Sequence, residues 1–174
     1  MSDLRPSEIL LSAEQIQKRV AELALELRRD APDEIHLVAV LKGAFIFLSD
    51  LVRNIEGPVS LDFIAVSSYA AGATTSGEVR LLKDLDSALD GRHVVIVEDI
   101  VDTGLTLTYL REVLRARNPK SLRTACLLSK PSRRLIDVPV EYIGFSIEDR
   151  FVVGYGLDYA EQYRNMREIA VLRL

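Results

Sequence analysis

The chain has 174 residues, of which 48% are hydrophobic and 28% are charged, and this composition is typical of one soluble globular domain with a full core. Its formal net charge of −4 disfavours nucleic acid as the main partner, which usually requires clustered basic residues, and no apolar run approaches the roughly 18 residues of a membrane span. The single cysteine excludes an internal disulfide, and the start of the chain lacks the apolar core of a signal peptide, so we expect a cytoplasmic protein.

Helix and strand patterns alternate along the chain. Ser12 to Gln15 has the pattern of a helix capping box, and the apolar stripe that follows predicts a helix to about Arg29. A buried strand is expected at 35–41, followed by a turn at 42–44 and a helix at 45–52. Further strands are expected at 59–68, 79–82, 94–97, 121–129 and 140–146, with a helix at 107–115 and a final edge strand at 169–172.

This alternation predicts an α/β fold, in which a single domain over residues 1–174 has a central, mainly parallel, twisted sheet flanked by helices on both faces. Ligands of such sheets bind beyond the carboxyl ends of the strands. Several polar residues follow expected strands and should therefore meet at that edge. They are Lys42, Glu98, Asp99, Asp102 and Lys130.

The stretch from 69 to 77 is small and polar, without any periodicity. It could be a plain flexible loop. A loop of this length inside a compact domain is more often functional, and a lid over the active site is the usual role. We therefore expect a mobile lid over about 68–80.

The most informative stretch is 94–106, where an apolar run breaks into acids and then into Asp-Thr-Gly-Leu-Thr before a helix. A loop of small residues can direct its N–H groups and hydroxyls at a phosphate, with the positive end of the helix behind it. Carboxylates would repel a bare phosphate, so Glu98 and Asp99 are expected to hold sugar hydroxyls or a divalent cation. A solvated charge pair, a Walker-B segment and a phospho-acceptor site are the alternatives. The last two are disfavoured, because the chain lacks a G-x-x-x-x-G-K-[ST] loop and a receiver domain has no use for Asp-Thr-Gly-Leu-Thr.

The segment Glu-Asp-Ile-Val-Asp-Thr-Gly-Leu-Thr at 98–106 resembles the phosphoribosyl-pyrophosphate (PRPP) motif of the type I phosphoribosyltransferases. The segments at 41–44, 128–131 and 151–159 resemble the hypoxanthine-guanine branch, and the resemblance runs through nearly the whole chain. It implies transfer of the 5-phosphoribosyl group from PRPP to N9 of hypoxanthine or guanine, giving IMP or GMP and pyrophosphate in purine salvage, with Mg²⁺ as cofactor. It also implies a small hood, built from N-terminal residues and about 131–174, and a homodimer or homotetramer.

The resemblance assigns roles on the sugar side of the site. Glu98 and Asp99 hold the ribose hydroxyls, directly or through Mg²⁺, and Asp102 faces the base and takes the purine N7 proton. Gly104 lets the backbone approach the phosphate closely. The loop that wraps the 5′-phosphate consists of Asp102, Thr103, Gly104, Leu105 and Thr106.

The resemblance also assigns the pyrophosphate and base sides. Lys42-Gly43 lies in the pyrophosphate loop, which often carries a non-proline cis peptide before the lysine, and Arg164 reaches the same group. On the base side, Asp158 holds a second Mg²⁺. The base itself is met by Lys130, which donates to the 6-oxo group, by Phe151, which stacks, and by the backbone of Val152, which reads the 2-position; Ser68 and Tyr69 begin the lid.

Two other functions stay open at this point. One is a phosphoribosyltransferase that prefers xanthine, because much of the base is read by main chain. The other is a regulator that keeps this fold and binds RNA, against which the acidic balance and the lack of a helix-turn-helix both argue. A protein that serves assembly alone would leave the paired acids unexplained.

Overall fold

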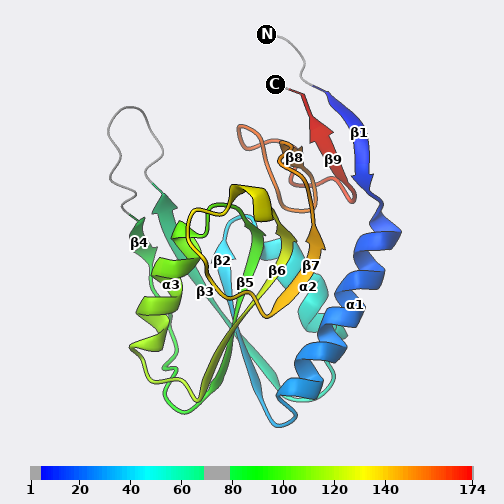
Figure 1. Ribbon diagram of the computed structural model, residues 1–174. Coiled ribbons are helices and arrows are strands. Elements are labelled where there is room, and N and C mark those ends of the chain that lie inside the picture. The colour runs from blue at the N-terminus through cyan, green and yellow to red at the C-terminus, as the bar shows by residue number, and fades with distance from the viewer. Residues whose placement is uncertain (1–4, 69–78, 174) are drawn as a thin grey trace.

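The computed structural model describes residues 5–68 and 79–173, and its largest element is a six-stranded sheet (Figure 1). The strands lie in the order β4-β3-β2-β5-β6-β7, and all neighbours are parallel except β3 and β4. This confirms the predicted α/β fold. The strands are β2 (Ile35–Leu41), β3 (Val59–Ser68), β4 (Val79–Lys83), β5 (His93–Val101), β6 (Ser121–Ser129) and β7 (Tyr142–Ser146).

Helices cover both faces of this sheet, as predicted. The helices α1 (Ala13–Asp30) and α2 (Phe45–Asn54) pack on one face, and α3 (Leu105–Arg115) packs on the other (Figure 1). Residues of β2 alternate between the two cores, with Leu37 on the α1 and α2 side and Val38 on the α3 side. Burial on both faces explains why the strand sequence is continuously apolar. The capping box is also confirmed, since Ser12 and Gln15 bond to each other's backbone N–H groups.

A second sheet has three antiparallel strands in the order β1-β9-β8. It contains β1 (Pro6–Leu11), β8 (Val152–Val153) and β9 (Ile169–Leu172), and it lies beyond the end toward which the arrows of the parallel strands point (Figure 1). We call this sheet, together with the chain between β8 and β9, the hood. The expected strand at 169–172 has the right bounds, but its expected edge position is wrong, because β1 pairs with one side of it and β8 with the other.

The central strand β5 is longer than its apolar run. We expected it to end at Val97, but the ladder with β6 continues through Glu98, opposite Cys126, to Val101, opposite Ser129. The two acids are thus part of the strand. A short 3-10 helix, η1 (Pro131–Arg133), follows β6, and the strand expected from residue 140 begins at Tyr142.

No helix within 5–68 and 79–173 is long and apolar enough to cross a membrane. The lid expected over 68–80, with Tyr69 at its start, falls on 69–78, which are outside the described residues. The flanking strands β3 and β4 end and begin at Ser68 and Val79.

Candidate active site

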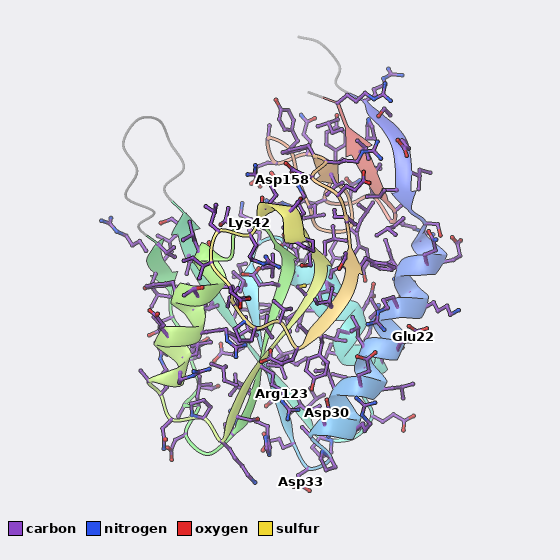
Figure 2. The ribbon with its side chains drawn as sticks, in the orientation of Figure 1. Glu22, Asp30, Asp33, Lys42, Arg123 and Asp158 are labelled. Carbon is purple, nitrogen blue, oxygen red and sulfur yellow. The ribbon has the colours of Figure 1, made fainter. Side chains whose placement is uncertain are left out.

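The polar residues expected at the carboxyl edge come from three adjacent strands. Lys42 follows β2, Glu98 and Asp99 lie near the end of β5, and Lys130 follows β6, where its N–H donates to the carbonyl of Val101 at 3.0 Å. Figure 2 shows Lys42 at the end of the sheet that faces the hood. The structure therefore brings these expected site residues to one end of the molecule.

The loop that follows β5 forms an anion-sized recess below α3. A cavity of about 90 Å³ is lined by Glu98, by residues 100–104 and by Thr106 and Leu107. The helix α3 begins after Gly104, which has no side chain to cap it, and the N–H of Leu105 donates to the Thr103 hydroxyl over a long 3.4 Å. A helix N-terminus that follows a threonine-rich loop is suited to bind a phosphate.

Gly104 is needed for a reason that the sequence did not reveal. Its φ of +89° is a left-handed conformation, and a Cβ there would lie 2.9 Å from the carbonyl oxygen of Ile136. The expected reason was close approach of phosphate to the backbone. The structure adds a second reason, because the segment after η1 lies against this glycine, and the N–H of Leu135 donates to the carbonyl of Thr103 at 2.9 Å. That segment thus holds the phosphate loop in place.

The carboxyl groups of Glu98 and Asp99 interact with each other near the end of β5, and each also has its own surroundings. Glu98 is only 7% exposed and lines the cavity on the α3 face. Asp99 lies against Gly43, where any Cβ would overlap its carboxylate, and it accepts a hydrogen bond from the N–H of Ile100 at 2.7 Å. Gly43 is therefore required because the loop after β2 packs directly on Asp99. The peptide bond between Leu41 and Lys42 is cis, as the resemblance implied.

Burial dominates the electrostatics of this pair. It raises the pKa of Glu98 well above its usual range, and the negative charge of Asp99 raises it further. Burial also raises the pKa of Asp99, although the Ile100 N–H and the charge of Arg164 oppose that rise. Uncompensated buried carboxylates are costly and cluster at functional sites, so the pair is better explained by a ligand than as a solvated charge pair.

The hood contributes cations to the same place. Gly156 packs against the carbonyl of Gly43, and Arg164 donates to the Gly156 carbonyl at 2.7 Å. Arg164 also pairs with Asp158 at 3.3 Å and with Glu161 at 3.0 Å, while its buried Nε has no hydrogen-bond partner within the described part of the chain. Lys42 Nζ lies 3.0 Å from a Glu161 oxygen. The two cations assigned to pyrophosphate therefore face one region from the sheet and from the hood.

The residues assigned to the base come from the end of β6, which neighbours β5 on the side away from β2, and from the start of β8. The Lys130 ammonium is nearly buried and pairs with Asp149 at 3.6 Å. Phe151 is 40% exposed and contacts Tyr159 edge to face, with 5.7 Å between ring centroids, while Val152 is buried in β8. An exposed aromatic ring can stack on a planar base, and a nearly buried ammonium can donate a hydrogen bond to it.

Asp102 is held by two arginines that sequence reasoning missed. Arg133 Nε donates to its carboxylate at 3.0 Å, and Arg134 donates to its backbone carbonyl at 2.8 Å. Arg133 also pairs with Asp149 at 3.7 Å, which links Asp102 to the partner of Lys130. A signal was available, because both arginines follow β6 at the same edge of the sheet that singled out Lys130.

The proposed Mg²⁺ ligands do not form a cage by themselves. Within residues 5–68 and 79–173, no three His, Cys, Asp or Glu side chains are grouped as they would be around a metal ion. Mg²⁺ is usually held by one or two carboxylates together with waters and substrate phosphates. The Glu98–Asp99 pair could supply those carboxylates, whereas Asp158 is engaged by Arg164 and by the N–H of Glu161 at 2.8 Å.

Comparison with known proteins finds relatives that match most of the chain. Residues 6–160 match the family model described as "Phosphoribosyl transferase domain". The chain is 48% identical over 167 residues to the hypoxanthine-guanine phosphoribosyltransferase of Bacillus subtilis, which covers 95% of this chain and 93% of that protein. It is 48% identical over 162 residues to the hypoxanthine phosphoribosyltransferase of Salmonella typhimurium, which covers 91% of each. A crystal structure of a hypoxanthine-guanine phosphoribosyltransferase from Bacillus anthracis matches with a TM-score of 0.93 and 48% identity, over 97% of this chain and all of that one (100%).

The raised pKa of Glu98 predicts how stability depends on pH. Between the unfolded-state value near 4.5 and the higher folded-state value, the folded protein binds more protons than the unfolded chain. The contribution of Glu98 to the free energy of unfolding therefore falls as pH rises through this window. We expect Glu98→Gln to be more stable than wild type to urea at pH 8, with the difference shrinking as the pH is lowered toward 4.5. Glu148→Gln, at an exposed glutamate, is the control, and parallel pH profiles for Glu98→Gln and wild type would contradict the burial argument.

Proposed function

The chain belongs to the phosphoribosyl transferase family, and within it we propose that the protein is a hypoxanthine(-guanine) phosphoribosyltransferase of purine salvage. It transfers the 5-phosphoribosyl group from PRPP to N9 of hypoxanthine or guanine and forms IMP or GMP with pyrophosphate. The observation that carries this proposal is the cavity in which the N-terminus of α3 meets the buried Glu98. A phosphate site beside a pair of carboxylates is suited to a phosphorylated sugar with free hydroxyls.

The sugar is bound between the loop 102–106 and the acidic pair. The 5′-phosphate is bound by Thr103, Thr106 and the first N–H groups of α3. Glu98 and Asp99 accept hydrogen bonds from the ribose hydroxyls. When bound, Mg²⁺ supplies charge compensation for the pyrophosphate, and the residues that hold it are the Glu98–Asp99 pair and, for a second ion, Asp158. Lys42 and Arg164 add two positive charges on the side of the leaving group.

The reaction needs no nucleophile from the protein. N9 of the purine attacks C1 of the ribose as pyrophosphate departs, through an oxocarbenium-like state. The only cysteine of the chain, Cys126, is buried in β6, and burial raises the pKa of its thiol to about 12, so the thiol stays protonated. The protein therefore acts through positioning and electrostatic compensation.

Lys130 and Asp102 have different roles toward the base: Lys130 selects it, and Asp102 takes its proton. Lys130 is a donor only, so it favours a 6-oxo group over the amino group of adenine, while Phe151 stacks on the ring and the backbone near Val152 reads the 2-position. Asp102 accepts the N7 proton. Its ion pair with Arg133 involves side chains that are 40% and 48% exposed, and pairs of this kind contribute little, so the purine can replace it at small cost.

Two further features of the proposal rest mainly on the family. The protein is proposed to be a homodimer or homotetramer, and exposed apolar side chains such as Leu25 on α1 and Phe45 on α2 are available for subunit contacts. A cytoplasmic location agrees with one buried, unpaired cysteine.

The first test is the reaction itself. We expect purified protein with PRPP, Mg²⁺ and hypoxanthine to form IMP and pyrophosphate, measured by chromatography, and we expect EDTA to stop the reaction and added Mg²⁺ to restore it. Competition among hypoxanthine, guanine and xanthine separates this activity from a xanthine preference. Absence of turnover with all three bases would refute the proposal, and a salt-dependent shift of RNA on a gel would then favour the regulator.

The second test concerns Asp102. Asp102→Asn keeps the size of the side chain but removes the proton acceptor, so we expect kcat to fall by about 10²- to 10⁴-fold while the Kd for PRPP is unchanged. Asp33→Asn is a matched control, because Asp33 is exposed at the opposite end of the molecule (Figure 2). Wild-type turnover in Asp102→Asn would exclude Asp102 as the proton acceptor.

A further inference from the structure

One carboxylate joins the two cations that the proposed function assigns to pyrophosphate. Glu161 Oε2 lies 3.0 Å from Lys42 Nζ, and Glu161 Oε1 lies 3.0 Å from an Nη of Arg164. Both oxygens of a single side chain are thus engaged by cations, one from the loop after β2 and one from the hood. A phosphate group with two oxygens directed at these cations has the same contacts available to it.

The hood fixes the position of Glu161 through its backbone. The N–H of Glu161 donates to Asp158 at 2.8 Å, and residue 161 has a φ of +62° in a tight turn. The side chain of Glu161 then extends from this turn to Lys42, whose Nζ it meets at 3.0 Å. The contact between Glu161 and Lys42 is therefore set by the turn.

The two cations depend on Glu161 to different degrees. Arg164 has further partners, since it donates to the Gly156 carbonyl at 2.7 Å and pairs with Asp158. Lys42 has no ion pair other than that with Glu161 within the described part of the chain. Loss of Glu161 would leave Arg164 in place and release Lys42.

We propose that Glu161 is an internal competitor of the diphosphate group, because its carboxylate occupies Lys42 and Arg164 in the free protein and must leave when PRPP or pyrophosphate binds. This inference rests on the proposed function. The side chains of Lys42 and Glu161 are 66% and 63% exposed, so their pair is weak and a polyanion displaces it easily. The same competition lowers the affinity for the substrate and for the product, and so it helps pyrophosphate to leave.

The test is Glu161→Gln, which keeps the shape of the side chain and removes its charge. We expect the Kd for PRPP and the inhibition constant for inorganic pyrophosphate both to fall by about two- to fivefold, which is the range of one exposed ion pair. The Kd is measured by calorimetry, and the inhibition constant is measured in the hypoxanthine assay. A purely structural role of Glu161 predicts the opposite sign, because a disturbed site binds both ligands more weakly.

Glu148→Gln is the matched control, since it removes one negative charge from an exposed position just before the hood. Unchanged constants in this control, with tighter binding in Glu161→Gln, support the inference. Equal changes in both variants indicate only a general field effect and overturn the inference. Unchanged or weaker binding of PRPP and pyrophosphate by Glu161→Gln also overturns it. Failure of the wild type to turn over any 6-oxopurine is a separate result that overturns the proposed function itself.

Discussion

The site depends on the burial of two successive carboxylates near the end of the central strand. Glu98 is almost inaccessible in the cavity under α3, and Asp99 is pressed against Gly43. Burial raises the pKa of both groups, so in the free protein the pair holds a proton more firmly than exposed acids do. Hydrogen bonds from ribose hydroxyls or a bound cation favour the ionised form, and the site is therefore completed by its ligand.

The hood is joined to this pair through packing as well as charge. Gly156 lies on the Gly43 carbonyl, and the neighbouring Tyr155 hydroxyl bonds to Asp50 of α2, which also accepts from Gln17 of α1 at 2.9 Å. Burial, together with the carboxylate of Asp50, raises the pKa of Tyr155, so its hydroxyl remains a donor. The helices α1 and α2 thus position the hood, which in turn places Arg164 and Glu161 close to the loop that carries Lys42.

Local sequence signals predicted the main sheet well, since they are carried by neighbouring residues. The capping box at Ser12 set the start of α1, a continuous apolar run marked β2, and shorter apolar runs marked β3 and β6. The same signals failed where partners are distant. Strand β1 lacks clean alternation and exists because it pairs with β9 at the far end of the chain, and this pairing also makes β9 a central strand. The strand β5 passes through its acids because the ladder with β6 continues.

The candidate site shows the same division. Motif spacing identified Glu98, Asp99, Asp102 and the phosphate loop, because these residues are contiguous. The pairing of Arg133 with Asp102 joins positions 31 residues apart, and that of Glu161 with Lys42 joins positions 119 apart, so neither follows from a local pattern. The role of Gly104 was likewise hidden, because the backbone that crowds it belongs to Ile136.

The central claim is that ligand binding draws a proton from the buried acidic pair. Calorimetric titration of PRPP with Mg²⁺, in buffers of different ionisation enthalpy at one pH, counts the protons released per site. Wild-type protein is predicted to release more protons than the Glu98→Gln variant, in which that position has none to give. Equal proton release by the two proteins would contradict the claim that burial of this pair organises the site.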